Sequence, residues 1–219
     1  MVTTPELTRF AAEKNARVYH LGDVATTKEI WFVLHGFGQL AGTFIKTFEP
    51  ALRPGRLIVA PEALNHFYVD HRARKVGASW MTSEDRDAQI ADYVHYLDRL
   101  GEQSLTRAPG ARIEVHGFSQ GSATAARWVA LGKVQAARLV IWGGELPPDP
   151  AVETWKDRLN SVDLNIVMGD QDEYYSRDRV DIAAEKLDAA GVNYTMHRFA
   201  GGHLVDPGVL AALAGGLSP

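Results

Sequence analysis

Short runs of β-branched and aromatic residues alternate along the chain with longer segments whose apolar positions recur at helical spacing. Seven such runs predict strands, at residues 17–21, 30–34, 57–60, 112–116, 139–142, 165–168 and 194–199. The run at 30–34, Ile-Trp-Phe-Val-Leu, lacks polar alternation, as expected of a central strand covered on both faces. Strands that alternate with helices form βαβ units, so the pattern predicts an α/β domain with a mostly parallel sheet.

Three segments have the periodicity of amphipathic helices. They cover residues 84–100, the stretch from just after Ser119 to about Leu131, and residues 177–190. Thr82 and Asp85 resemble a capping box at the start of the first. A glycine follows each segment and predicts its end: Gly101, Gly132 and Gly191.

The segment between Glu62 and Ser83 is too broken in pattern for a helix or a long strand, so it predicts a surface loop. Aromatic side chains lie among its polar residues, namely Phe67, Tyr68 and Trp80. Two interpretations stay open: these aromatics line a substrate site, or they anchor the loop to the core.

Composition narrows the class of protein. A chain of 219 residues suits one domain spanning 1–219, and its 46% hydrophobic and 23% charged residues are ordinary for a globular protein. The net charge of −4 argues against a nucleic-acid-binding protein. With no cysteine, the chain can form neither disulfides nor thiolate sites.

The first residues have neither a basic start nor an apolar core, so no signal peptide is predicted. No apolar stretch approaches the roughly 20 residues that a membrane-spanning helix needs. We therefore expect a cytoplasmic protein without an integral membrane segment. The sequence does not indicate an oligomeric state.

The order of strand, tight turn and helix around Ser119 carries the strongest chemical signal. The strand at 112–116 leads directly into Gly117-Phe118-Ser119-Gln120-Gly121, and a helical pattern follows. A nucleophile elbow needs this order, because only glycine at the flanks lets strand and helix approach closely. Ser119 is the candidate nucleophile; the alternative is an ordinary turn with a serine N-cap.

A serine nucleophile needs a base, and His203 is placed to supply it. It follows the last predicted strand in Gly201-Gly202-His203, where glycines permit a sharp turn. The alternative is a histidine in a surface loop without a catalytic role.

The base in turn needs a carboxylate that holds its tautomer. Asp170 and Asp172 both follow the strand at 165–168, and Glu145 follows the strand at 139–142. We favour Asp172 and expect Asp170 to fix the loop, while Glu145 remains a third candidate. A solvated acidic loop is the alternative.

A glycine-rich turn follows the strand at 30–34 and predicts an oxyanion site. In His35-Gly36-Phe37-Gly38 the backbone can aim N–H groups at a developing negative charge. The predicted donors are the N–H groups of Phe37 and Gln120, the latter being the residue after the nucleophile. His35 is expected to fix this turn by hydrogen bonding. Nucleophile, acid and base then occur in the chain order of α/β-hydrolases.

These motifs together resemble the small carboxylesterase, lysophospholipase and acyl-protein thioesterase family of α/β-hydrolases. The matching segments are Leu34-His35-Gly36-Phe37-Gly38, Pro61-Glu62-Ala63, Ser79-Trp80, Gly117-Phe118-Ser119-Gln120-Gly121, Gly169-Asp170-Gln171-Asp172 and Gly202-His203. The resemblance implies an α/β-hydrolase fold with helices on both sheet faces and no large cap domain. It also implies catalysis by Ser119, Asp172 and His203, with Trp80 near the acyl site and no cofactor.

The chain departs from the family pattern at three places. Ser122 stands where the family often has glycine, Tyr174-Tyr175 stands where it has Val-Pro, and residues 65–75 have no counterpart. These differences leave the predicted triad intact and leave the substrate undetermined.

The predicted function is therefore a serine hydrolase that cleaves small or acyl-chain esters or thioesters through an acyl-enzyme intermediate. The alternatives are a peptidase or lactonase that uses the same triad, or a silent hydrolase fold that acts as a binding module. A third is a metal site built from His66, Asp70 and His71, although two imidazoles and one carboxylate without helical spacing favour it little.

Overall fold

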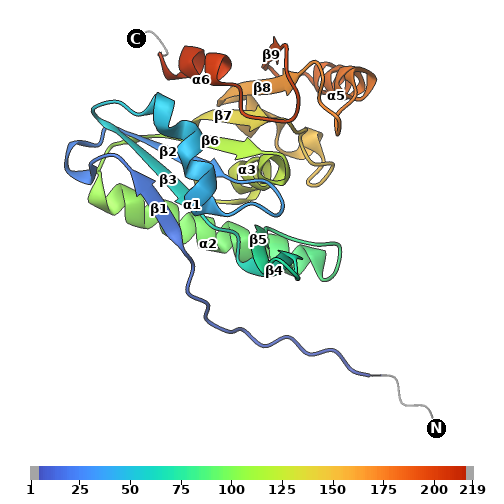
Figure 1. The fold of residues 1–219 in the computed structure, drawn as a ribbon. Coiled ribbons are helices and arrows are strands. Elements are labelled where there is room, and N and C mark those ends of the chain that lie inside the picture. Colours follow the sequence, from blue (N-terminus) through green and yellow to red (C-terminus); the bar gives the residue numbers. More distant parts are fainter. Residues whose placement is uncertain (1–4, 216–219) are drawn as a thin grey trace.

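The computed structural model describes residues 5–215 and is built around a seven-stranded sheet (Figure 1). The strand order is β1-β3-β2-β6-β7-β8-β9. The strands are β1 Val18–Leu21, β2 Glu29–Leu34, β3 Arg56–Pro61, β6 Arg112–Phe118, β7 Ala136–Trp142, β8 Asp163–Gly169 and β9 Thr195–Phe199. Only β1 is antiparallel to its neighbour, β3. Each predicted strand matches one of these, so the mostly parallel sheet is confirmed.

Helices cover both faces of the sheet. They are α1 Ala41–Phe44, α2 Arg86–Arg107, α3 Gln120–Leu131, α4 Lys156–Asn160, α5 Arg177–Ala190 and α6 Pro207–Ala214, with short 3-10 helices η1 Val24–Thr26, η2 Ile45–Ala51 and η3 Val152–Thr154. Alternate β2 residues enter different cores: Phe32 packs with residues of α2, α3 and α5, whereas Trp31 packs with residues of α1, η2 and α6. This two-sided burial explains the unbroken apolar run in β2.

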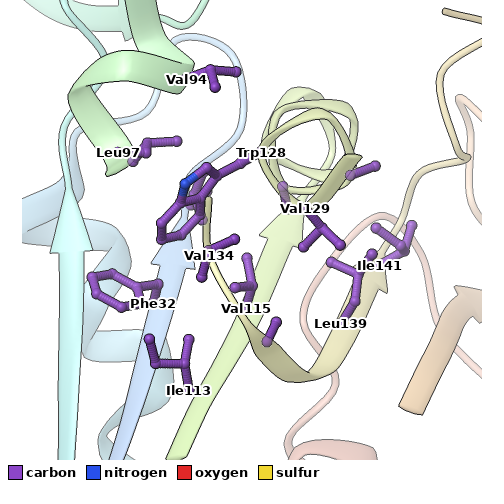
Figure 2. Close-up of a cluster of buried hydrophobic side chains, with 14 of the residues drawn as sticks. Phe32, Val94, Leu97, Ile113, Val115, Trp128, Val129, Val134, Leu139 and Ile141 are labelled. Carbon is purple, nitrogen blue, oxygen red and sulfur yellow. The ribbon is translucent and has the colours of Figure 1, made fainter. Parts of the chain in front are cut away.

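Trp128 of α3 is the centre of the larger core (Figure 2). Its ring lies edge-on to Phe32, with the ring centroids 5.1 Å apart, and Val94 and Leu97 of α2 lie on its other side (Figure 2). Its buried indole N–H donates to Asp98 Oδ1 over 2.9 Å, so the ring is fixed by packing and by one hydrogen bond. The core thereby sets the position of α3, which begins directly after the candidate nucleophile Ser119.

Helix α2 differs from its prediction at both ends. It continues through Gly101 to Arg107, because Gly101 is buried against the Trp128 ring and serves close helix packing rather than chain reversal. At its start, Asp85 has a left-handed backbone (φ 46°) and its side chain makes no cap hydrogen bond. The capping-box prediction with Thr82 is therefore wrong. The ends predicted for α3 and α5 are confirmed.

The predicted loop between Glu62 and Ser83 is instead largely a β-hairpin. Its strands are β4 Asn65–Asp70 and β5 Lys75–Ser79. Gly77 contacts the turn after β2 so closely that a Cβ there would lie 2.3 Å from the Gly38 carbonyl oxygen. Apolar residues remain exposed on this hairpin, including Tyr68 and Val69, so no clean alternation marks it in the sequence. Within residues 5–215, every helix is too short or too polar to span a bilayer.

Candidate active site

Ser119 lies at the junction of β6 and α3 in a backbone conformation that L-residues rarely adopt. Its φ is 54° and its ψ is −117°. Its backbone N–H donates to the Trp142 carbonyl over 2.9 Å, which ties the turn to β7. A strained residue held by its surroundings at a strand end is typical of a functional position.

The two glycines that flank Ser119 are required by contact with backbone. A Cβ on Gly117 would lie 2.2 Å from the Gly121 carbonyl oxygen, and a Cβ on Gly121 would lie 2.2 Å from that of Leu34. Backbone atoms cannot move aside as a flexible side chain can, so both positions exclude any larger residue. The Gly117-x-Ser119-x-Gly121 motif is thus explained by close packing of β6, α3 and β2.

His203 and Asp172 are directly hydrogen-bonded. The distance from His203 Nδ1 to Asp172 Oδ2 is 2.7 Å, and the Asp172 side chain is fully buried. Its other oxygen, Oδ1, accepts hydrogen bonds from the backbone N–H groups of Tyr174 (2.9 Å) and Tyr175 (3.1 Å). Since Nδ1 of His203 must donate to the carboxylate, Nε2 is left as the proton acceptor.

The other two candidate acids lie elsewhere. Glu145 forms an ion pair with Arg179. Asp170 is exposed and lies 4.0 Å from Arg198, while its backbone N–H donates to the Phe199 carbonyl. Neither carboxylate contacts His203, so geometry favours Asp172 among the three.

Ser119 and His203 line one cavity of about 500 Å³. Phe37, Phe118 and Tyr174 also line it, and the His203 ring packs against Tyr174 (centroids 4.7 Å apart) and Phe118 (4.8 Å). No hydrogen bond joins the Ser119 hydroxyl to His203 in the described part of the chain. Such contacts are often long before substrate binds and shorten in the complex.

The turn after β2 leaves a backbone donor free beside Ser119. Gly36 N–H donates to the Gln39 side chain (2.8 Å) and Gly38 N–H donates to the Ala78 carbonyl (2.9 Å). Among residues 5–215, neither the N–H of Phe37 nor that of Gln120 donates a hydrogen bond. Both are therefore free to donate to a ligand oxygen.

His35 fixes this turn by hydrogen bonding, as predicted. It is fully buried; Nδ1 lies 2.8 Å from the Gly36 carbonyl oxygen, and Nε2 accepts from the Ala63 N–H over 3.1 Å. Burial lowers the pKa of His35 below its usual value. A neutral imidazole with one nitrogen donating and the other accepting satisfies both contacts. Both ring nitrogens of His35 are therefore used in structural hydrogen bonds, and His35 is not free to act as a base.

The three aromatic residues predicted to line the substrate site lie in different places, and none is among the described residues that line this cavity. Trp80 is 1% exposed, and its indole N–H donates to the His35 carbonyl over 2.9 Å, so it supports the turn from inside. Phe67 stacks on Phe37, with centroids 5.0 Å apart, at the edge of the site. Tyr68 points outward and is 55% exposed.

Sequence reasoning did not assign Tyr174 to the site, although Tyr174 lines the cavity beside His203. The available signal was the departure from the Val-Pro pattern that follows the acid in the family. The metal site considered at His66, Asp70 and His71 is not assembled: His66 instead lies 2.7 Å from a Glu62 oxygen. No group of three metal-ligating side chains occurs within the described range.

Comparisons with known proteins agree with this geometry. Residues 25–217 match the model of the phospholipase/carboxylesterase family. No curated protein matches the sequence.

Solved structures similar to this chain include acyl-protein thioesterase 2 from Zea mays, which is 18% identical with a TM-score of 0.74 over 92% of this chain and 97% of that one. A carboxylesterase from Mesorhizobium loti is 17% identical with a TM-score of 0.71 over 93% and 100%. Esterase PE8 is 20% identical with a TM-score of 0.69 over 92% and 97%. These likenesses confirm the α/β-hydrolase fold without a large cap. With the family model matching most of its length, the chain belongs to the phospholipase/carboxylesterase family of α/β-hydrolases.

Proposed function

We propose that this protein is a serine hydrolase that cleaves carboxylic esters or thioesters, with Ser119, His203 and Asp172 as its catalytic triad. The observation that carries the proposal is the 2.7 Å contact between His203 and the buried Asp172 carboxylate, beside a cavity that Ser119 also lines. An imidazole held in this way presents Nε2 toward the cavity as a base.

In the first step, Nε2 of His203 takes the hydroxyl proton of Ser119 while Oγ attacks the carbonyl carbon. The backbone N–H groups of Phe37 and Gln120 donate to the resulting oxyanion. The tetrahedral intermediate collapses as His203 returns the proton to the leaving oxygen or sulfur, and the acyl group stays on Ser119.

In the second step, His203 takes a proton from water, and the hydroxide attacks the acyl carbon. Collapse of the second intermediate releases the carboxylic acid and returns the proton to Ser119. Asp172 remains ionised throughout and stabilises the imidazolium that forms in each step. Apart from the attacking water, the chain supplies every group that these steps use.

The substrate class follows from the family and the site together. The family is that of phospholipases and carboxylesterases, and similar structures include a thioesterase, so we assign ester or thioester cleavage. We expect a small ester or thioester, or one with an extended acyl chain, since no large cap encloses the cavity. Peptidase and lactonase chemistry use the same triad and are outcomes that a substrate screen distinguishes.

The test is hydrolysis of p-nitrophenyl acetate by the wild-type protein and by Ser119→Ala. We expect kcat/KM to fall by at least about 10³-fold in the variant, since only oxyanion stabilisation and binding remain. Wild-type rates no faster than those of Ser119→Ala would refute the proposal and indicate a silent hydrolase fold.

A further inference from the structure

The cavity that Ser119 and His203 line also contains four aromatic residues and one acidic residue. The aromatic residues are Phe37, Phe44, Phe118 and Tyr174, and the acidic residue is Glu173. None of the described residues that line this cavity is a lysine or an arginine. The mechanism proposed above takes only a backbone N–H group from this set, so the side chains are available to select a substrate.

Two of these aromatic residues are open to solvent. Phe37 is 59% exposed and Tyr174 is 63% exposed, whereas Phe44 and Phe118 are each 6% exposed and lie deeper. Exposed aromatic rings at a cavity gain free energy when a ligand covers them. The face of an aromatic ring also carries partial negative charge, so it attracts a cation more strongly than a neutral group of the same shape.

Glu173 adds a negative charge to the cavity. Its carboxylate lies close to the residue before His203, because a Cβ on Gly202 would be 3.6 Å from Glu173 Oε2. Glu173 is exposed, and within residues 5–215 it forms no ion pair with a lysine, arginine or histidine. A cationic ligand in the cavity would therefore meet a carboxylate that no other residue of this range neutralises.

Glu173 and Tyr174 lie on the side of the cavity that the leaving group occupies in the proposed mechanism. The Tyr174 ring packs against the His203 ring with centroids 4.7 Å apart, and Glu173 directly precedes Tyr174 in the chain. Since His203 returns a proton to the leaving oxygen, the alcohol part of the ester must lie next to this imidazole. Glu173 and Tyr174 are therefore nearer to the alcohol part than to the acyl part.

We propose that this hydrolase prefers esters whose alcohol part carries a quaternary ammonium group. The inference rests on the proposed function and names its substrate class. Aromatic faces attract such a cation although it has no N–H group to donate, and the carboxylate balances its charge. The reaction is the acyl transfer described above: the ammonium alcohol leaves with the proton from His203, and water then releases the acyl group from Ser119. Glu173 and Tyr174 are the specificity-determining residues.

The test compares two esters of the same shape, acetylcholine and 3,3-dimethylbutyl acetate, in which a carbon atom replaces the charged nitrogen. Both release acetic acid, so titration of the acid at constant pH measures both rates. The charge of acetylcholine does not depend on pH, which keeps the comparison free of substrate titration. We expect kcat/KM to be at least about tenfold higher for acetylcholine, because only the cation gains from the ring faces and from the carboxylate.

Two pairs of variants assign this preference to the carboxylate and to the ring. Glu173→Gln should lower the ratio of the two kcat/KM values at least about fivefold, whereas Asp170→Asn removes the same charge from the same loop outside the cavity and should leave the ratio unchanged. Tyr174→Leu should lower the ratio at least about threefold. Its matched control is Tyr68→Leu, which removes an exposed tyrosine that does not line the cavity and should leave the ratio unchanged.

Binding provides a readout that does not depend on turnover. In an NMR titration, Ser119→Ala should bind choline, and the double variant with Glu173→Gln should bind it at least about fivefold more weakly. Equal binding by both would overturn the inference, as would a wild-type ratio below about threefold or a ratio that Glu173→Gln leaves unchanged, in a protein that still hydrolyses the neutral ester. Absence of Ser119-dependent hydrolysis of either ester would instead overturn the proposed function.

Discussion

Asp172→Asn tests how the proposed catalytic base, His203, is oriented. The amide oxygen of asparagine can take the place of Oδ1 and keep the hydrogen bonds from the backbone N–H groups of Tyr174 and Tyr175. The amide nitrogen then faces His203 Nδ1, where a carboxylate oxygen now accepts over 2.7 Å. Because an amide NH₂ only donates, Nδ1 must become the acceptor and the proton moves to Nε2.

The expected magnitude follows from this change of tautomer. A protonated Nε2 cannot accept the Ser119 hydroxyl proton, and the imidazolium formed in the transition state also loses its ionised partner. The equivalent change in a Ser-His-Asp triad on another fold lowers kcat about 10⁴-fold, or ~5.5 kcal/mol. Since the loop amides keep an acceptor, we expect the free energy of unfolding to change by less than about 1 kcal/mol.

The assay is kcat for p-nitrophenyl acetate, with urea unfolding of the same preparations. Asp170→Asn and Glu145→Gln are matched controls, because both neutralise a nearby acid that does not contact His203. We expect each control to stay within threefold of wild type. An Asp172→Asn variant that retains a tenth of the activity, or a comparable loss in either control, would refute the assignment of the acid.

Three further predictions concern stability. Gly121→Ala should lower the free energy of unfolding by about 3 kcal/mol, because its Cβ would lie 2.2 Å from a β2 carbonyl oxygen. Gly215→Ala is the control and should be near neutral, because its Cβ would have no contact closer than 3.5 Å. Urea unfolding measures both variants. Burial alone would raise the pKa of Glu29, but hydrogen bonding and charge at Arg56 contribute to holding it at about 2. Glu29 therefore stabilises the fold above pH ~4.5, and this contribution is lost as pH falls toward 2. Glu29→Gln should cost about 2 kcal/mol at pH 7, with the difference from wild type narrowing below pH ~4.5 in unfolding curves at each pH. Burial lowers the pKa of His35, so this imidazole binds a proton more readily in the unfolded chain than in the folded protein. The free energy of unfolding should therefore fall as the pH drops below ~6.5. In His35→Gln this part of the pH dependence should disappear, and an unchanged pH dependence would contradict the neutral, buried imidazole.

The sheet and the position of Ser119 could be predicted because their signals are local. Continuous apolar runs such as β2 reflect burial on both faces. The two glycines around Ser119 reflect backbone packing so close that a Cβ at either position would lie 2.2 Å from a carbonyl oxygen. His203 could be proposed because a glycine pair precedes it after the last strand. In each case the residues that show the sequence pattern are the same residues whose burial or backbone packing requires it.

Other features depend on contacts between distant segments, which a single sequence does not display. Glu145 forms an ion pair with Arg179 of α5, whereas Asp172 is the acid hydrogen-bonded to His203, and neither contact is visible in the sequence. Trp80 was expected beside substrate, but its indole N–H instead supports the His35 carbonyl from within the core. The β4–β5 hairpin escaped prediction because its outer apolar residues are exposed, and α6 because eight residues give too little periodicity.

The most direct test of the account is the intact mass of the protein after exposure to a fluorophosphonate, followed by peptide mapping. An activated serine displaces fluoride and gains one phosphonyl group, so we predict a single adduct on Ser119 in the wild-type protein and none in Ser119→Ala. A wild-type protein that stays unlabelled, or an adduct on a different residue, would contradict the central claim that Ser119 is the nucleophile.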